Sequence, residues 1–411
     1  MSRLHQDSLA FTLLLGSLGA LPPFSIDTPL PALPQTASAL NSQSATVLLT
    51  LSSFMAGFAI AQLVFGPLSD RFGRRPTLLC GCALFTLASF LCVLAPSIGF
   101  LLAARFAAGC GAGAGMVLVL AMVRDLFDGA AGRAKLSFVS LVIGVAPMVA
   151  PTVGAVILLW GDWRAIYAVL GAGGATLTLA VWLGLDESLA QPNRQALQVR
   201  LLRASYLQVL RHPVAFSYIL VNGLVFGCMF AYVSGSAFTL MRLHGLTTLQ
   251  YGLAFAGTAL SIMLGAFVSG RLGQRHVAAV VPLTLGLGMA AAGSVSLLLL
   301  TLVGVSSFGI VFALLVVSTC GYGLTAPNAA HGALQPLPQI AGVASASLGF
   351  VQMASGSLAA ALVAGWADGR TALSMAATMA LYAALALGIY AACIRPRERA
   401  AARALCAEAA E

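Results

Sequence analysis

Two residues of this chain stand out because an acid and a base are costly to place inside a membrane. Asp27 is the one carboxylate, and Arg105 the one basic residue, that the sequence places within a long apolar segment. Ionisable side chains in hydrocarbon are rare and mark proton pathways, ion pathways or binding sites. Burial disfavours the charged form of an acid and a nearby cation favours it, so Asp27 is a candidate proton carrier. The alternative is a structural carboxylate near a helix end.

The two residues are expected at similar depth. Arg105 lies about seven residues, or about 10 Å at the helical rise, from the outer end of its segment, and Asp27 also falls in the outer half. On two helices of one bundle, such an acid and base could pair or share a hydrogen-bond network. The alternative for Arg105 is a guanidinium that only caps backbone carbonyls.

The elements that carry these residues follow from composition. The chain has 411 residues, is 60% hydrophobic and 8% charged, and has a mean hydropathy of +0.96. Apolar runs of about 20 residues recur throughout, each long enough to cross about 30 Å of hydrocarbon as a helix. The alternating segments of a membrane β-barrel are absent, so we expect an all-α membrane protein. The twelve expected helices are 9–32, 46–68, 77–96, 98–121, 136–159, 164–185, 213–240, 249–270, 277–302, 305–330, 341–366 and 371–394.

The distribution of cations predicts the orientation. Seventeen lysines and arginines fall in the tails and connections on the Met1 side, against Arg164, Arg242 and Arg370 on the other side. Cytoplasmic loops carry such an excess, so both termini are predicted to be cytoplasmic. The net charge of +9 is explained by this topology and indicates no nucleic-acid partner. Alanine-rich helices and arginine in place of lysine favour a GC-rich bacterium, and therefore its inner membrane.

A polar stretch near the middle divides the chain. We expect a six-helix bundle over 1–186, a cytoplasmic central loop over 187–212, and a second six-helix bundle with a short cytoplasmic tail over 213–411. The loop at 70–75, Asp-Arg-Phe-Gly-Arg-Arg, is weakly repeated at 270–275 as Gly-Arg-Leu-Gly-Gln-Arg. Two repeated halves with a binding site between them near the bilayer midplane are typical of rocker-type transporters.

The most specific string is at 66–76, Gly-Pro-Leu-Ser-Asp-Arg-Phe-Gly-Arg-Arg-Pro. It resembles the loop between helices 2 and 3 of the major facilitator superfamily, with the pattern G-x-x-x-D-R-x-G-R-R. In that family the loop acts as a latch on the cytoplasmic side. Glycine permits close helix approach or a tight turn, and a positive-inside signal alone is the alternative. The implied conformational switch residues are Gly66, Asp70, Arg71, Gly73, Arg74 and Arg75, with Arg124 and Asp125 as further members; Arg74 and the pair Arg124-Asp125 are the expected partners of Asp70.

Two further strings carry the acid and the base. Residues 26–34, Ile-Asp-Thr-Pro-Leu-Pro-Ala-Leu-Pro, resemble the end of helix 1 in drug/proton antiporters of the bicyclomycin- and phenicol-exporting (Bcr/CflA) branch, where M-D-M-Y-L-P-A-L-P is common. Here Thr28-Pro29 replaces Met-Tyr, so substrate detail does not carry over. Pro22, Pro23 and Pro29 predict a kink or break beside Asp27. Arg105 opens a segment that resembles the helix 4 pattern R-x-x-x-G.

Residues 144–155 resemble the antiporter pattern G-P-x-x-G-G of helix 5, with Ala150 and Ala155 replacing two glycines. The resemblance implies export, and generic close packing of small residues is the alternative. The residues that carry it are Gly144, Pro147, Pro151 and Gly154.

A cavity for amphipathic compounds is expected to be apolar and aromatic with few polar groups. The second half has no charge within its apolar segments, so a multiply charged substrate is not expected. The cavity candidates are Met55, Gln62, Asn222, Phe226, Tyr232, Tyr251, Phe255, Asn328 and Gln352.

Taken with the resemblance, these features predict a proton-coupled exporter of small amphipathic drugs, such as phenicols or bicyclomycin-like compounds, that works by alternating access. Protons are the expected coupling ion, with no metal or other cofactor, and a monomer is expected. An exporter of an endogenous sugar, amino acid or nucleoside is the alternative within transport. A non-transporting receptor or scaffold is the alternative from another class. No nucleophile elbow, phosphate loop or metalloprotease string is present, so an enzyme is not expected.

Overall fold

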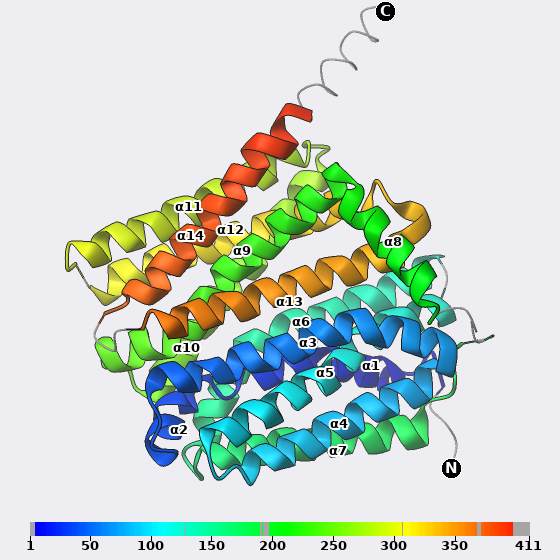
Figure 1. Ribbon diagram of the computed structural model, residues 1–411, viewed down its shortest axis with the longest axis horizontal. Helices are drawn as coiled ribbons and strands as arrows, with labels where there is room; N and C mark the ends of the chain where they lie inside the picture. Colours follow the sequence, from blue (N-terminus) through cyan, green and yellow to red (C-terminus); the bar gives the residue numbers. More distant parts are fainter. Residues whose placement is uncertain are drawn as a thin grey trace, which may run out of the picture. The chain divides into compact units, whose positions relative to one another are not determined.

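The computed structural model describes residues 5–127, 129–189, 191, 197–305, 307–367 and 371–397. Across these ranges the secondary structure is helical and contains no β-strand (Figure 1). Twelve of the described helices are long and apolar enough to cross a membrane, as the sequence predicts. The expected C-terminal tail beyond Arg397 lies outside the described residues, as do the orientation residues Arg3, Arg194, Arg370, Arg399 and Arg403.

The chain divides into two compact units. The first comprises Met1–Leu202 and Ser236–Gly257, and the second comprises Arg203–Gly235 and Thr258–Glu411. The residues that carry the predicted acid, base and switch loop all belong to the first unit.

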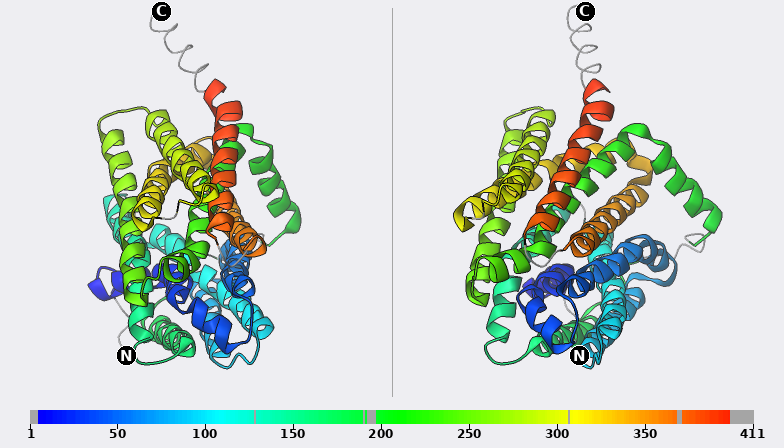
Figure 2. Two further views of the ribbon diagram at one scale, coloured as in Figure 1. Left: turned by 90° about the vertical axis from the view of Figure 1, so that its left-hand side faces the viewer. Right: turned by 60° about the vertical axis from the view of Figure 1, so that its left-hand side comes forward.

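Helix α5 lies at the centre of the first unit, where it packs against α1, α3 and α4 (Figures 1 and 2). Helix α7 covers α4, and α6 packs along α1. This arrangement brings Arg105 of α5 within reach of α1, which carries Asp27. The elements are α1 (Leu9–Asp27), η1 (Leu30–Ala32), α2 (Leu33–Ala39), α3 (Ser44–Phe72), α4 (Arg74–Val93), α5 (Ile98–Leu126), α6 (Gly129–Ile157) and α7 (Trp163–Gly184).

The first span is broken beside Asp27. The span expected over 9–32 consists of α1, which ends at Asp27, followed by a short 3₁₀ helix and α2. Proline has no N–H and fixes its own φ, so Pro29 cannot continue the α-helical hydrogen-bond pattern. The predicted break is therefore present, and the apolar region extends further than expected, to Ala39.

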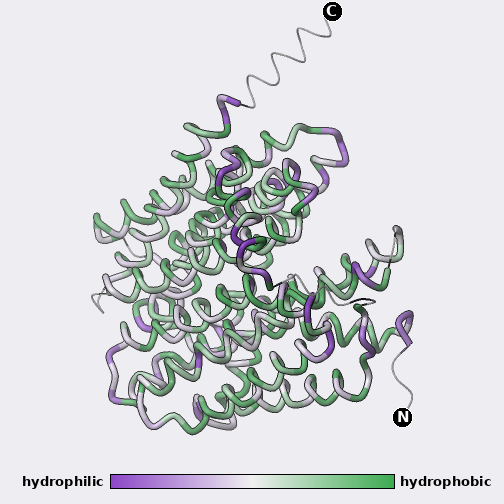
Figure 3. Tube along the Cα trace, turned by 45° about the vertical axis from the view of Figure 1, so that its right-hand side comes forward, coloured by the Kyte–Doolittle hydropathy of each residue, from purple (hydrophilic) through white to green (hydrophobic). Residues whose placement is uncertain are grey.

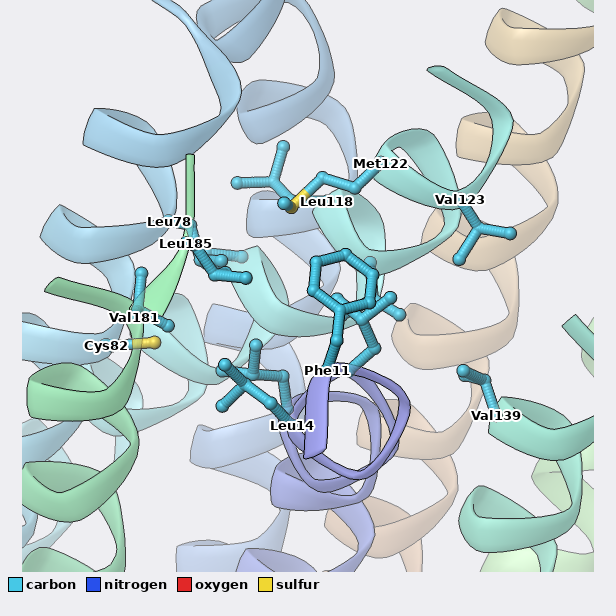
Figure 4. Packing of buried hydrophobic residues seen from close by; sticks show 14 residues of the cluster. Phe11, Leu14, Leu78, Cys82, Leu118, Met122, Val123, Val139, Val181 and Leu185 are labelled. Atoms are coloured by element: carbon cyan, nitrogen blue, oxygen red, sulfur yellow. The ribbon is translucent and has the colours of Figure 1, made fainter. Parts of the chain in front are cut away.

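One apolar cluster holds the helices of the first unit together at the end where α1 begins. Phe11 and Leu14 of α1 face Leu118 and Met122 of α5 (Figure 4). The cluster also includes Leu78 of α4, Val139 of α6, Val181 of α7 and Leu185. Because the cluster draws on α1, α4, α5, α6 and α7, it fixes the position of α1 relative to α5.

The second unit is also helical, and α11 packs against both α12 and α14. Helices α9 and α10 cross the boundary between the units. The hydrophilic residues concentrate at helix ends and connections (Figure 3). The elements are α9 (Pro213–Ala237), η2 (Phe238–Leu243), α10 (Thr248–Gln274), α11 (Val280–Leu302), α12 (Phe308–Leu334), η3 (Pro338–Ile340), α13 (Ala341–Gly365), α14 (Leu373–Ile389) and η4 (Tyr390–Ile394).

The central polar stretch contains a helix that the sequence analysis did not predict. Helix α8 covers Val199–Arg211, and its Val209 is buried in a cluster with Ala215 and Ile219. Arg203 and Arg211 are exposed on the same helix. The segment has no proline or glycine and is amphipathic, which favours a helix that packs by one face.

Candidate functional site

Arg105 is held by α1, but not through Asp27. Its Nη1 donates to the hydroxyl of Ser25 and its Nη2 to the carbonyl oxygen of the same residue, both at 3.0 Å. The side chain is 1% exposed, and its Nε has no hydrogen-bond partner. Of the two interpretations, the structure shows the guanidinium bound to a backbone carbonyl and a hydroxyl, with no direct ion pair to Asp27.

Two aromatic rings complete the surroundings of Arg105. The guanidinium carbon lies 4.4 Å from the ring centre of Phe54 on α3 and 5.6 Å from that of Tyr167 on α7. A desolvated cation over an aromatic face gains about 2 kcal/mol. The rings therefore offset part of the cost of burying a charge that has no carboxylate partner.

Glycines explain how α3 and α5 approach closely enough for this stacking. A Cβ built on Gly109 would lie 1.9 Å from the carbonyl oxygen of Phe54, and one on Gly57 would lie 2.1 Å from that of Phe106. No side chain fits at either position without moving the backbone of the other helix. The glycine of the R-x-x-x-G pattern thus places Phe54 beneath Arg105.

The carboxylate of Asp27 is buried without a partner. Asp27 is 5% exposed, and no residue in the described part of the chain forms a salt bridge or hydrogen bond with its carboxylate. The neighbouring Thr28 hydroxyl is also buried and has no hydrogen-bond partner. An unpaired carboxylate is expensive to bury, and protonation removes that cost.

Helix α6 closes over this end of α1. A Cβ on Gly154 would lie 2.0 Å from the carbonyl oxygen of Thr28, so the expected close packing of the antiporter-like segment is found at this residue. It is not found at Gly144, where a Cβ would meet nothing within 4 Å. Pro147 and Pro151 lie inside α6, which continues through both.

Arg74 is the centre of the switch loop. Its guanidinium binds Asp70 through Nη1 and Asp125 through Nε, the latter at 2.8 Å, and Nη1 also donates to the Ser69 hydroxyl at 2.6 Å. Asp70 and Asp125 come from α3 and α5, so one cation connects these helices to the start of α4. Arg124, expected as a partner of Asp70, is exposed and forms no ion pair within the described ranges.

Two glycines of the loop behave differently. Gly73 has φ of 99°, a conformation open to glycine, and forms the turn between α3 and α4. The expected close approach at Gly66 is wrong for this structure, because no atom lies within 4 Å of a Cβ placed there. Arg71 is exposed and lies over the ring of Phe72.

Glu187 is a member of this site that sequence reasoning missed. Its Oε1 accepts from the backbone N–H of Arg74 at 2.8 Å, and its Oε2 from that of Arg75 at 3.1 Å. The first N–H groups of a helix have no partner within it and favour negative charge. Glu187, which follows the end of α7, therefore caps the start of α4. Arg75 makes a second contact between the two helices by donating to the carbonyl oxygen of Trp182 in α7. The acidic string Asp-Glu-Ser at 186–188 was the available signal for a helix cap, but its position in the sequence does not show which helix it caps.

We expect Glu187→Ala to destabilise the start of α4. Loss of a side-chain cap costs about 1 kcal/mol, and the two capped N–H groups here would remain without that acceptor. Hydrogen exchange at residues 74–77 should therefore quicken several-fold, with a lower thermal unfolding midpoint.

Asp162→Ala is the matched control for this variant. Asp162 caps α7 by accepting from the N–H of Arg164, and it does not contact the switch loop. It should lower the unfolding midpoint similarly while leaving exchange at 74–77 unchanged. Equal exchange at 74–77 in the two variants would contradict the assigned role of Glu187.

The cavity candidates in the first unit are mostly buried. Met55 and Tyr251 are 0% exposed, Phe255 is 3% exposed, and Gln62 is half-buried. Tyr251 shares a hydrogen bond of 2.9 Å with Ser236, and its ring lies 6.1 Å from that of Phe255. The structure thus brings Tyr251 and Phe255 together on α10.

In the second unit, part of the candidate set converges on Tyr322 of α12. The Phe226 ring lies 6.0 Å from that of Tyr322, and the Gln352 amide donates to the Tyr322 hydroxyl at 3.2 Å. Asn222 donates to the carbonyl oxygen of Ala326. Tyr322 was not a candidate, because only packing of α9, α12 and α13 reveals it.

The other two cavity candidates of this unit make hydrogen bonds to α10. Tyr232 shares a hydrogen bond of 2.7 Å with Thr258, and Asn328 donates to Ser269 at 2.7 Å. These contacts connect α9 and α12 to α10. Hydroxyl and amide hydrogen bonds of this kind hold membrane helices together.

Twelve apolar spans with a buried acid and a buried base define a multi-pass membrane protein. Its sequence matches the profile of the Major Facilitator Superfamily over residues 15–360, so the chain belongs to that family. It is accordingly a transporter and not an enzyme.

Several curated relatives cover nearly the whole chain. An uncharacterized MFS-type transporter, YdgK, of Bacillus subtilis is 34% identical over 91% of this chain and 92% of its own length. A bicyclomycin resistance protein homolog of Haemophilus influenzae is 29% identical, with 88% and 90% covered. A chloramphenicol resistance protein of Pseudomonas aeruginosa is 32% identical, with 82% and 80% covered.

Solved structures agree on the fold. A bacterial homolog of the human lysosomal transporter Spinster, in an inward-facing and occupied conformation, superposes with a TM-score of 0.71 at 17% identity, covering 94% of this chain and 96% of that one. A POT family transporter in complex with 5-aminolevulinic acid gives 0.73 at 14% identity, with the same coverage. Together with the bacterial relatives and the twelve spans, the fold indicates a multi-pass inner-membrane protein.

Proposed function

We propose that this transporter exports small amphipathic compounds, including phenicols or bicyclomycin-like drugs, in exchange for protons. The observation that carries the proposal is the buried Asp27 carboxylate, which has no hydrogen-bond or ion-pair partner among the described residues. A group of this kind can take up a proton on one side of the membrane and release it on the other. The names of the bicyclomycin and chloramphenicol resistance relatives support the class of substrate.

In the proposed cycle, protonation of Asp27 from the outer side neutralises the carboxylate and favours release of the substrate. Loss of the proton to the cytoplasm prepares the protein for another molecule. Movement of two six-helix halves, 1–186 and 213–411, about the central loop supplies alternating access, with the switch loop stabilising one conformation. Both termini are cytoplasmic in this proposal, the unit of function is the monomer, and Arg105 assists the proton carrier.

The proposal predicts proton-driven transport by the purified protein. Proteoliposomes loaded with chloramphenicol or bicyclomycin should show faster transport when a pH gradient is imposed than without it. Each pH unit supplies about 1.4 kcal/mol per proton, enough to sustain about a tenfold concentration ratio of substrate. Transport that is indifferent to the gradient would contradict the coupling, and transport of sugars, amino acids or nucleosides alone would favour an endogenous substrate.

A further inference from the structure

The carbonyl group of Ser25 is left without its helical donor. In an α-helix the carbonyl of residue i accepts from the N–H of residue i+4, which for Ser25 is Pro29. Proline has no N–H, so this buried carbonyl must find another donor. Arg105 supplies it, with Nη2 at 3.0 Å.

The same residue offers Arg105 a second acceptor. The Ser25 hydroxyl accepts from Nη1, also at 3.0 Å, so the planar guanidinium uses two of its donors on one residue. Ser25 is 1% exposed, and the guanidinium carbon lies 4.4 Å from the ring centre of Phe54. Arg105 is therefore held by two hydrogen bonds to α1, at a site that includes no carboxylate.

This site directs Arg105 away from Asp27. Side chains two positions apart on a helix point to different faces, so a guanidinium bound at Ser25 does not face the Asp27 side chain. The pattern that this segment resembles has tyrosine at the position of Pro29. A tyrosine retains its N–H and would leave the Ser25 carbonyl satisfied within the helix.

We propose that Ser25 and Pro29 form a holding site that keeps Arg105 from pairing with Asp27, and that Arg105 moves between this site and the ionised Asp27. The inference rests on the proposed role of Asp27 as proton carrier. Ser25 and Pro29 act as positioning residues, because neither exchanges the proton. While Arg105 is at the holding site, Asp27 lacks a cation and its protonation is favoured. Once Arg105 reaches Asp27, the carboxylate is stabilised.

Other titratable groups facing Arg105 are few. Tyr167 of α7 and Cys92 of α4 are close enough to interact electrostatically with its charge. Helix α3 contributes the apolar ring of Phe54. None of the described residues in contact with Arg105 supplies a carboxylate, and Asp27 is the acid that α1 carries.

The test is an infrared pH titration of the Asp27 carboxyl group in the purified protein, with the band assigned by its loss in Asp27→Asn. Ser25→Ala removes one acceptor, and Pro29→Ala restores an N–H that competes for the Ser25 carbonyl. Each should release Arg105 toward Asp27 and move the titration midpoint to lower pH by about one unit, the equivalent of one charged hydrogen bond. Ser25→Thr keeps the hydroxyl and should titrate like the unsubstituted protein.

Ser53→Ala is the matched control, because the Ser53 hydroxyl donates to the Leu102 carbonyl at 2.7 Å and does not contact Arg105. It should leave the midpoint unchanged, whereas a purely structural role for Ser25 predicts no difference between the two serine variants. Unchanged midpoints in Ser25→Ala and Pro29→Ala overturn the holding site. Because the titration needs no transport, absence of proton-driven efflux would refute the proposed function separately.

Discussion

The Asp27→Asn variant is expected to lose all accumulation driven by a pH gradient. Asparagine has a similar shape but cannot release a proton, so the exchange of proton for substrate stops. At an imposed gradient of one pH unit, the ratio of substrate concentrations across the membrane should fall from about 10 to about 1. The measurement is transport in proteoliposomes with the gradient imposed, alongside exchange of labelled for unlabelled substrate without a gradient.

Asp162→Asn is the matched control for this substitution. Asp162 is a carboxylate that caps the start of α7, and asparagine is an equally good helix cap. Its transport should resemble that of the unsubstituted protein. Retained gradient-driven accumulation in Asp27→Asn would remove the basis of the proton-coupling proposal, and retained exchange with lost accumulation would support it most directly.

The second large effect is expected for Arg74→Ala at the switch loop. Arg74 is the shared cation of Asp70 and Asp125, and its side chain is 10% exposed. A charged hydrogen bond contributes about 1.5–3 kcal/mol, and the Asp70 pair contributes less because that carboxylate is 43% exposed. We therefore expect the substitution to destabilise the conformation in which these ion pairs are formed by about 2–4 kcal/mol.

Hydrogen exchange at residues 69–77 and the thermal unfolding midpoint report this loss. If exchange occurs by opening of the loop, it should quicken by about one and a half to three orders of magnitude. Arg74→Lys should fall in between, because an ammonium cannot bridge both carboxylates with the same geometry. Arg71→Ala is a suitable comparison, since Arg71 is exposed and contacts the ring of Phe72. Similar exchange in the Arg71 and Arg74 variants would show that the ion pairs do not hold the loop.

The loop also shows why the partners of a motif are harder to predict than the motif. The string at 66–76 predicted a turn at Gly73 and a pairing of Asp70 with Arg74, both of which are local in sequence. Glu187 lies more than a hundred positions from Arg74, and its capping role depends on where α7 ends relative to α4. The predicted partner Arg124 is adjacent to Asp125, but the two residues point differently from α5, and only Asp125 reaches Arg74.

The sequence by itself determined the twelve apolar spans, the acid and base within them, and the break at Pro29. Each depends on composition along one segment: hydrophobic length sets a span, and a missing N–H ends a helix. The tertiary structure alone decided that Arg105 binds Ser25, that Gly109 admits the backbone of Phe54, and that Phe226 and Gln352 meet at Tyr322. These contacts join different helices, and their geometry depends on how side chains and backbones from separate segments pack within a few ångströms, which no single segment encodes.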